Sequence, residues 1–174
     1  MKNIFAIVGS ASENSSNERL ISYLENLTRD YFRFTVYKDL KKLPHFDPEL
    51  SIGDTPTAIV ELRNQIADSD GVLLCTPEYI FSVPSGLKNI LEWCVSTTVF
   101  TDKPLGIITA SADGQHGHNE LKMIMRTLMA RFTDDATLLI NGIKGKVDIN
   151  GNIRDIQTMH QLKKFLDSLK TLFI

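Results

Sequence analysis

Apolar residues in this chain fall into short runs separated by longer segments of helical spacing. The short runs are rich in branched residues and end at glycine, proline or polar clusters, which is typical of buried strands. They cover Asn3–Val8, Arg33–Tyr37, Gly71–Thr76, Pro104–Ala110 and Thr137–Ile140. The longer segments repeat apolar residues at helical spacing, which predicts helices over Asn17–Leu27, Thr57–Ala67, Ser85–Val95, Glu120–Phe132 and Ile156–Phe173.

This alternation of strands and helices predicts an α/β fold. Helices of about ten residues or more can connect one parallel strand to the next in the right-handed sense, and they then cover both faces of the sheet. We therefore expect a doubly wound parallel sheet of about five strands, with helices on both faces. The chain has 174 residues and no repeat or linker, so we expect a single domain over residues 1–174.

Polar residues concentrate in three loops that follow predicted strands. These loops are Gly9–Asn17, Pro77–Pro84 and Ser111–Asn119. In an open sheet of this kind, ligands bind beyond the carboxyl ends of the strands, where the strand order reverses. If the strand order is 2-1-3-4-5, the first two loops flank this point and the third lies beside them, so we expect the three loops to share one ligand site.

The first loop, Gly9–Asn17, offers hydroxyls, amides and the free backbone N–H groups at the start of a helix. That combination suits a phosphate dianion. The candidate contacts are Ser10, Ser12, Ser15, Ser16 and Asn17. The loop lacks the GxGxxG of a dinucleotide site and the Gly-Lys-Ser/Thr of a P-loop, so a terminal monophosphate fits better. The alternative is that these residues only cap the helix and turn the chain.

The second loop, Pro77–Pro84, has two aromatic residues between two prolines that stiffen the backbone. A stiff backbone and flat side chains are suited to bind a planar ring. Backbone N–H and C=O groups that the prolines keep out of regular structure can bind the polar edge of such a ring. The candidate contacts are Pro77, Glu78, Tyr79, Ile80, Phe81 and Ser82. The alternative is that Tyr79 and Phe81 pack on neighbouring residues or on another subunit.

The third loop, Ser111–Asn119, has glycines that allow a backbone to approach a ligand closely. The candidate contacts are Ser111, Asp113, Gly114 and Gly117. His116 and His118 have the spacing of a metal pair but no third ligand nearby, so we expect surface or hydrogen-bonding histidines and no metal site. We expect the same of His45 and His160.

Composition narrows the function classes. The chain has 19 basic and 21 acidic residues, a formal charge of -2 and no basic cluster, so nucleic acid is an unexpected partner. The first apolar run is too short for a signal peptide, and no apolar run approaches the ~20 residues of a membrane span, so we expect a cytoplasmic protein that contacts no membrane. Cys75 and Cys94 lie in apolar segments without metal-site spacing, and we expect buried free thiols.

The three loops together resemble those of the NADPH-dependent FMN reductase family. The first loop is similar to the family's Gly-Ser-x-Arg-x-x-Ser-x-Asn at Gly9, Ser10, Ser15 and Asn17, with Ser12 in place of the arginine. The most specific match is the segment from Thr76 to Trp93, TPEYIFSVPSGLKNILEW, which follows the family's Pro-Glu-Tyr-Asn and Leu-Lys-Asn pattern. Ile80 replaces the usual Asn. The third loop is similar to the family's glycine-rich loop at Gly114 and Gly117.

This resemblance implies a flavodoxin-like fold that binds FMN and takes electrons from NADPH or NADH. The electrons would pass to a small acceptor such as a quinone, an azo compound, a metal oxyanion or free flavin. The resemblance also implies a homodimer or homotetramer with FMN close to the interface. Because the cofactor carries the reaction, we expect no catalytic side chain. Changes at Ser10, Ser15 or Asn17 should weaken FMN binding, and changes at Tyr79 should alter turnover or assembly.

Two other functions fit the same fold. A flavodoxin-type electron carrier would bind FMN without oxidising NAD(P)H, but such carriers are markedly acidic and a charge of -2 argues against one. A regulatory or interaction protein that has lost its flavin would also keep the fold, and Ser12 and Ile80 are departures in that direction.

Overall fold

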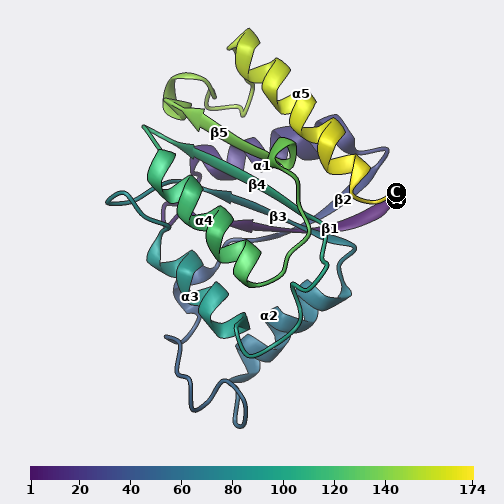
Figure 1. Cartoon of the computed structure of the whole chain (residues 1–174). Helices are drawn as coiled ribbons and strands as arrows, with labels where there is room; N and C mark the ends of the chain where they lie inside the picture. Colours follow the sequence, from purple (N-terminus) through teal and green to yellow (C-terminus); the bar gives the residue numbers. More distant parts are fainter.

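One parallel sheet of five strands forms the centre of the molecule, as the computed structural model of residues 1–174 shows (Figure 1). The strands are β1 (Lys2–Val8), β2 (Phe32–Tyr37), β3 (Gly71–Thr76), β4 (Leu105–Ser111) and β5 (Thr137–Asn141). Their order is β2-β1-β3-β4-β5, and every neighbouring pair is parallel. The predicted fold class and strand order are therefore confirmed.

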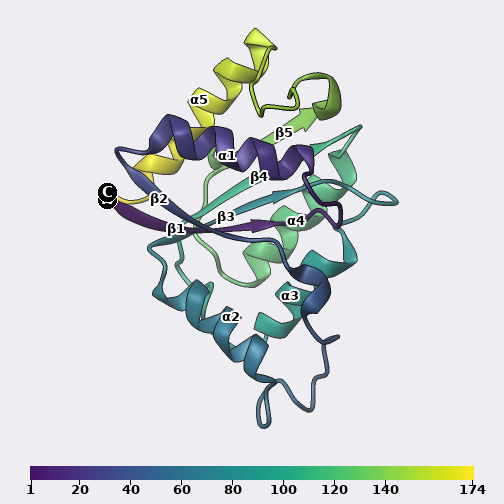
Figure 2. The same cartoon turned by 180° about the vertical axis from the view of Figure 1, so that it is seen from behind.

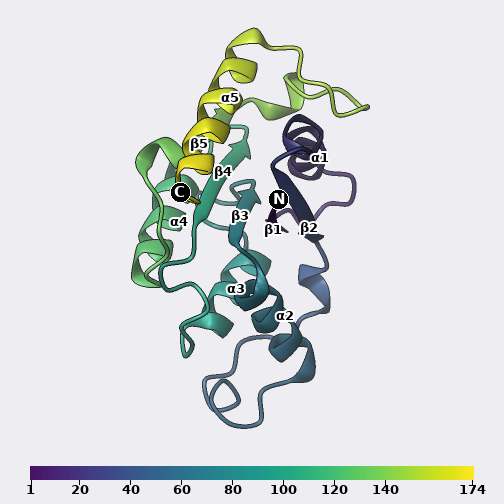
Figure 3. The ribbon, with the colours of Figure 1, turned by 90° about the vertical axis from the view of Figure 1, so that its right-hand side faces the viewer.

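Five α-helices connect the strands and cover both faces of the sheet. They are α1 (Ser16–Thr28), α2 (Thr57–Asp68), α3 (Ser85–Cys94), α4 (Gln115–Thr127) and α5 (Ile156–Thr171). Short 3-10 turns occupy Leu40–Lys42, Asp134–Ala136 and Ile143–Gly145. The view from behind in Figure 2 and the side view in Figure 3 show α1 and α5 on one side of the sheet and α2, α3 and α4 on the other.

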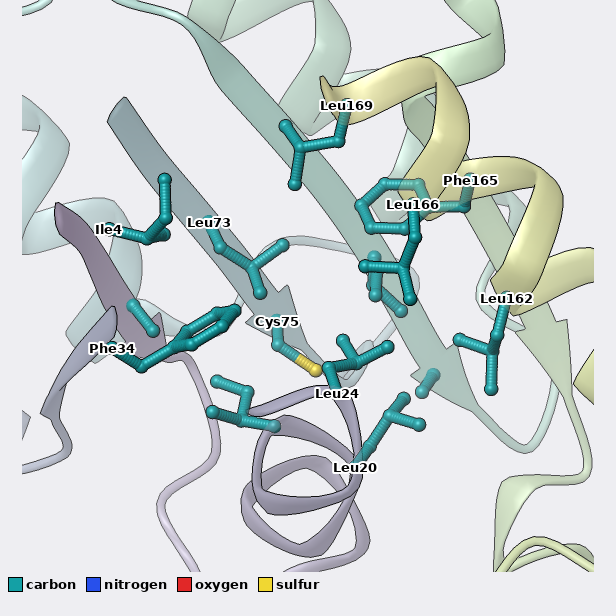
Figure 4. Close-up of a cluster of buried hydrophobic side chains, with 14 of the residues drawn as sticks. Ile4, Leu20, Leu24, Phe34, Leu73, Cys75, Leu162, Phe165, Leu166 and Leu169 are labelled. Atoms are coloured by element: carbon teal, nitrogen blue, oxygen red, sulfur yellow. The ribbon is translucent and has the colours of Figure 1, made fainter. Parts of the chain in front are cut away.

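Alternate residues of the central strands supply two separate cores. In β1, Ile4 belongs to the core under α1 and α5, whereas Phe5 belongs to the core under α2, α3 and α4. Leu73 and Val72 of β3 divide in the same way. Figure 4 shows the first core, with leucines of α1 and α5 meeting the strand side chains around Cys75. Because both faces are buried, the central strands read as unbroken apolar runs in the sequence.

The bounds predicted for α4 are wrong. The amphipathic pattern predicts a helix over Glu120–Phe132, but the helix covers Gln115–Thr127. It starts earlier because groups from another loop satisfy its first N–H groups, and it ends earlier because Met129 takes a left-handed conformation with a φ of 59°. Phe132 still packs against the core although it lies beyond the helix.

Both cysteines are buried and free, as predicted. Burial raises the pKa of each thiol, that of Cys94 to about 12, so neither is a ready nucleophile. No helix in the structure combines the length and the apolar character that crossing a membrane requires.

Candidate functional site

The carboxyl ends of the strands meet at a hollow of about 830 Å³, within the size range of ligand and cofactor sites. The three predicted loops contribute to its wall, as the sequence implies. Of the candidate residues, those that line it are Ser10, Ser12, Ser15, Ser16, Asn17, Pro77, Glu78, Tyr79 and Ser111. The structure places six other candidates outside this wall, namely Ile80, Phe81, Ser82, Asp113, Gly114 and Gly117.

The backbone of the first loop presents a row of N–H groups that have no acceptor in the protein. Between Ser10 and Asn17, only the Ser12 N–H is engaged, and it donates to the Ser10 hydroxyl at 3.2 Å. The rest of the row leads into the N-terminus of α1, where the helix dipole adds partial positive charge. Free N–H groups at the start of a helix are suited to an anion such as a phosphate.

The side chains of Ser15 and Asn17 hold this loop in shape. The Ser15 hydroxyl caps α1 by accepting from the Glu18 N–H at 3.2 Å. Asn17 is buried, and its amide donates to the Ala110 carbonyl at 3.1 Å while its Oδ1 lies 3.3 Å from the Cys75 sulfur. Substitution of Asn17 would therefore act through loop shape, because its side chain is already fully engaged.

Gly9 allows the first loop to lie close to β3, because it has no side chain. A Cβ atom at this position would lie 2.2 Å from the Thr76 hydroxyl oxygen and 2.6 Å from its Cβ. The Gly9 N–H donates to the Cys75 carbonyl at 2.8 Å, which continues the pairing of β1 with β3. The loop therefore leaves the sheet directly beside the second loop.

The second loop closes as a tight hairpin. Tyr79 and Ser82 exchange two backbone hydrogen bonds of 3.1 Å, and the two turn residues, Ile80 and Phe81, have φ values of 50° and 57°. These side chains are 95% and 68% exposed and form the rim beside the hollow. The Tyr79 hydroxyl lies 3.5 Å from the Ser10 hydroxyl, so the second loop touches the first.

Glu78 joins the second loop to the third. Its carboxylate accepts from the Gly114 N–H at 3.2 Å and the Gly117 N–H at 2.6 Å, and so caps the N-terminus of α4. Gly117 allows this packing, since a Cβ there would lie 3.3 Å from the Ser82 backbone. The structure thus gives both glycines a role between two loops, and their contact with a ligand stays a prediction.

A second carboxylate strengthens the same junction. Glu120 of α4 accepts from the Ser82 hydroxyl at 2.7 Å and from the Val83 N–H at 2.8 Å. Asp113 binds β5 separately, because the Asn141 amide donates to its carbonyl at 2.9 Å. Ser82 and Asp113 therefore fix the second and third loops to neighbouring elements.

His118 is a buried histidine bound to β4. Its Nδ1 lies 2.9 Å from the Thr109 hydroxyl, and burial, aided by the charge of Lys122, lowers its pKa to about 4. It is therefore neutral at physiological pH. His116 packs its ring edgewise on Phe81 at a centroid distance of 5.4 Å. No group of three or more histidine, cysteine or acidic side chains is arranged to hold a metal ion.

Sequence reasoning missed two segments at this edge of the sheet. The turn Gly142–Gly145, directly after β5, forms one wall of the large hollow and carries Lys144. The segment Lys38–Lys42, after β2, lines an adjoining cleft of about 440 Å³ that also includes Ser10 and Tyr79. Both segments directly follow a strand of the parallel sheet. Because the carboxyl ends of parallel strands lie at the same edge, this position could have indicated from the sequence that they line the site.

The chain is similar to known flavin-dependent reductases. The family model described as NADPH-dependent FMN reductase matches residues 2–144. A 2-hydroxy-1,4-benzoquinone reductase of Burkholderia is 31% identical over 171 residues, which cover 94% of this chain and 92% of that protein. An NADPH:quinone oxidoreductase of Arabidopsis thaliana is 30% identical over 175 residues, which cover 96% and 89%.

A solved structure agrees on the fold. The flavoenzyme NAD(P)H:(acceptor) oxidoreductase FerB of Paracoccus denitrificans superposes with a TM-score of 0.81, at 24% identity, over 99% of this chain and 97% of that one. The sequence matches extend over both sides of the hollow, from the first loop to the turn after β5. On this evidence, the chain belongs to the NADPH-dependent FMN reductase family.

Proposed function

We propose that the protein binds FMN in the 830 Å³ hollow and reduces a small quinone with electrons from NADPH or NADH. The observation that carries this proposal is the row of unengaged N–H groups from Ser10 to Asn17, which suits the terminal phosphate of FMN. Membership of the family and the quinone reductases among its relatives support the same cofactor and acceptor.

Each loop has a distinct part in holding the cofactor. The hydroxyls of Ser10, Ser12 and Ser16 and the backbone N–H groups bind the phosphate, while Ser15 and Asn17 keep the loop in shape. Pro77, Glu78 and Tyr79 face the ring, and Ser111 fixes their backbone by accepting from the Glu78 N–H at 3.2 Å. Gly114, Gly117, Asp113 and Ser82 support this wall. The hydride and electron transfer from the nicotinamide to the acceptor would be chemistry supplied by the bound FMN.

No side chain of the hollow is assigned as an acid or base. The Glu78 carboxylate is committed to two N–H groups of α4, and the Tyr79 hydroxyl is within reach of Ser10. The protein's contribution is to position the ring and to leave one face accessible. Ile80 and Phe81 form an exposed apolar rim where a flat, apolar acceptor such as a quinone would dock.

We further propose that the protein is a cytoplasmic homodimer. Helices α3 and α4 flank a groove of about 260 Å³ that five apolar residues line, Leu91, Val95, Met123, Ile124 and Leu128, together with Lys88, Glu92 and Thr127. The side chains of Val95 and Met123 are 59% and 61% exposed. Large apolar side chains exposed together in one groove are typical of a surface that binds another protein. The buried free thiols and the use of NADPH or NADH fit the reducing cytoplasm.

Anaerobic reduction and reoxidation test the proposal. The protein is loaded with FMN, freed of excess flavin and oxygen, and mixed with NADPH or NADH while the flavin absorbance is followed. We expect the yellow colour to bleach, and to return when 1,4-benzoquinone is added. An azo dye, chromate or free FMN added in place of the quinone ranks the alternative acceptors.

The other outcomes identify the rival functions. FMN that binds but does not bleach with either nicotinamide would contradict a reductase and indicate an electron carrier. A protein that binds no FMN at high concentration would contradict the proposal at its first step and indicate a flavin-free regulatory role.

A further inference from the structure

The first loop contains no cation. From Gly9 to Asn17 the sequence has four serines, two asparagines and Glu13, but neither lysine nor arginine. Glu13 lines the hollow beside the unengaged N–H groups and adds negative charge there. Partial charges on N–H groups favour a phosphate dianion, but a full positive charge close by would strengthen its binding considerably.

Two cationic side chains from other parts of the chain line the same hollow. Arg19 of α1 donates to the Asn14 carbonyl at 2.8 Å and to the Asp148 carbonyl at 3.4 Å. It therefore ties the first loop to the segment after β5. These two bonds to backbone carbonyls fix the guanidinium in place, so Arg19 positions the loop and adds its charge from a fixed point.

Lys144 is the other cation, and it has no partner. It lies in the turn Ile143–Gly145, is exposed, and makes no hydrogen bond or ion pair in the protein. Its neighbour Lys146, in contrast, lies 3.9 Å from the Asp155 carboxylate. An unpaired ammonium on a flexible stem that lines the same hollow as a row of unengaged N–H groups is suited to bind a phosphate as a point charge.

We propose that Lys144 binds the phosphate of the flavin cofactor from the segment after β5. This inference rests on the proposed function, since it requires FMN in the large hollow. Lys144 thus supplies the full positive charge that the first loop lacks. The Ser10–Asn17 backbone and the Lys144 ammonium would together hold the phosphate.

Comparison of FMN with riboflavin tests this assignment, because riboflavin has the same ring without the phosphate. Binding of each flavin to the protein is measured by quenching of flavin fluorescence, with Lys144→Ala, Lys144→Glu and the control Lys146→Ala. We expect Lys144→Ala to raise the Kd for FMN about tenfold, as for the loss of one charged hydrogen bond, and Lys144→Glu to raise it further. The Kd for riboflavin should stay the same in all variants, and Lys146→Ala should bind FMN as the wild type does.

A second substitution keeps the test decisive. Ser12→Arg places a guanidinium on the first loop, and we expect it to restore FMN binding in the Lys144→Ala background without changing riboflavin binding. An unchanged Kd for FMN in Lys144→Ala and Lys144→Glu overturns the assignment, as does an equal loss for FMN and riboflavin. Both results leave the proposed function intact, whereas a wild-type protein that binds no FMN overturns that function itself.

Discussion

Ile80 and Phe81 are held in a backbone conformation that their side chains disfavour. Both have positive φ values, where an L-residue costs roughly 1–2 kcal/mol and a β-branched residue such as Ile80 is a particular outlier. Neither side chain recovers this cost by burial, since both are exposed. The usual residues of such a turn are Asn and Gly. Strain of this kind, kept beside a cavity, indicates that the exposed side chains serve binding.

The strain predicts that Ile80→Gly stabilises the folded protein. Glycine adopts the left-handed conformation freely, so we expect the free energy of unfolding to rise by about 1 kcal/mol, part of the gain being offset by the flexibility of glycine in the unfolded chain. Urea denaturation measures this change. Ile52→Gly is the matched control, because Ile52 is 84% exposed without a positive φ, and it should give no gain. A loss of stability in Ile80→Gly would contradict the account of the turn.

At the scale of elements, the starts of α1 and α4 differ in how far they could be predicted. The cap of α1 is local, since Ser15 is three residues from the Glu18 N–H that it binds, and the sequence predicts this start within a residue or two. The cap of α4 is the Glu78 carboxylate, 36 to 39 residues away in the chain. No local pattern contains such a partner, so the predicted helix began too late and Gly117 was placed in a loop.

His118, which joins α4 to β4 through Thr109, predicts that the folded protein loses stability at acidic pH. Burial keeps His118 neutral in the folded protein, with a pKa lowered from 6.5 to about 4, while the Lys122 charge lowers and the Asp134 charge raises that pKa. In the unfolded chain the ring gains its proton near its ordinary pKa. The unfolded state therefore binds more protons between these values, and the stability present above about pH 6.5 falls as the pH approaches 4.

Variants at two histidines isolate this effect. His118→Asn keeps a polar group near Thr109 but does not titrate, so the difference in stability between wild type and variant should shrink by on the order of 2 kcal/mol from pH 7 to pH 4. Urea denaturation at a series of pH values measures it. His160→Asn, at an exposed histidine, should follow the wild type at every pH. A constant difference between His118→Asn and wild type would exclude His118 as the source.

For the whole molecule, the class of sheet follows from regular features of the sequence, whereas the wall of the site after β5 does not. Alternating apolar runs and helical segments predict a doubly wound parallel sheet, and the loops after β1, β3 and β4 come together as expected for the order 2-1-3-4-5. Lys144 lies in an ordinary polar stretch of sequence, and only the folded chain brings it to the hollow that Ser12 also lines. The groove between α3 and α4 also combines residues far apart in the sequence, each of which alone resembles a normal helix position.

That groove predicts how the protein assembles. We expect the wild type to sediment as a dimer in analytical ultracentrifugation, and Met123→Glu to shift it to monomers because a buried charge without a partner is costly. Ile149→Glu is the control, since Ile149 is equally apolar and 79% exposed but lies outside the groove. This variant should remain a dimer. A wild type that stays monomeric, or a Met123→Glu variant that stays dimeric, would exclude this face as the interface.

The most direct test of the account is a crystal structure of the protein with FMN. We predict the phosphate against the backbone N–H groups of Ser10–Asn17 and the ring against Pro77–Tyr79, in the hollow that also includes Ser111. FMN bound elsewhere, or a first loop without phosphate in crystals saturated with FMN, would contradict it.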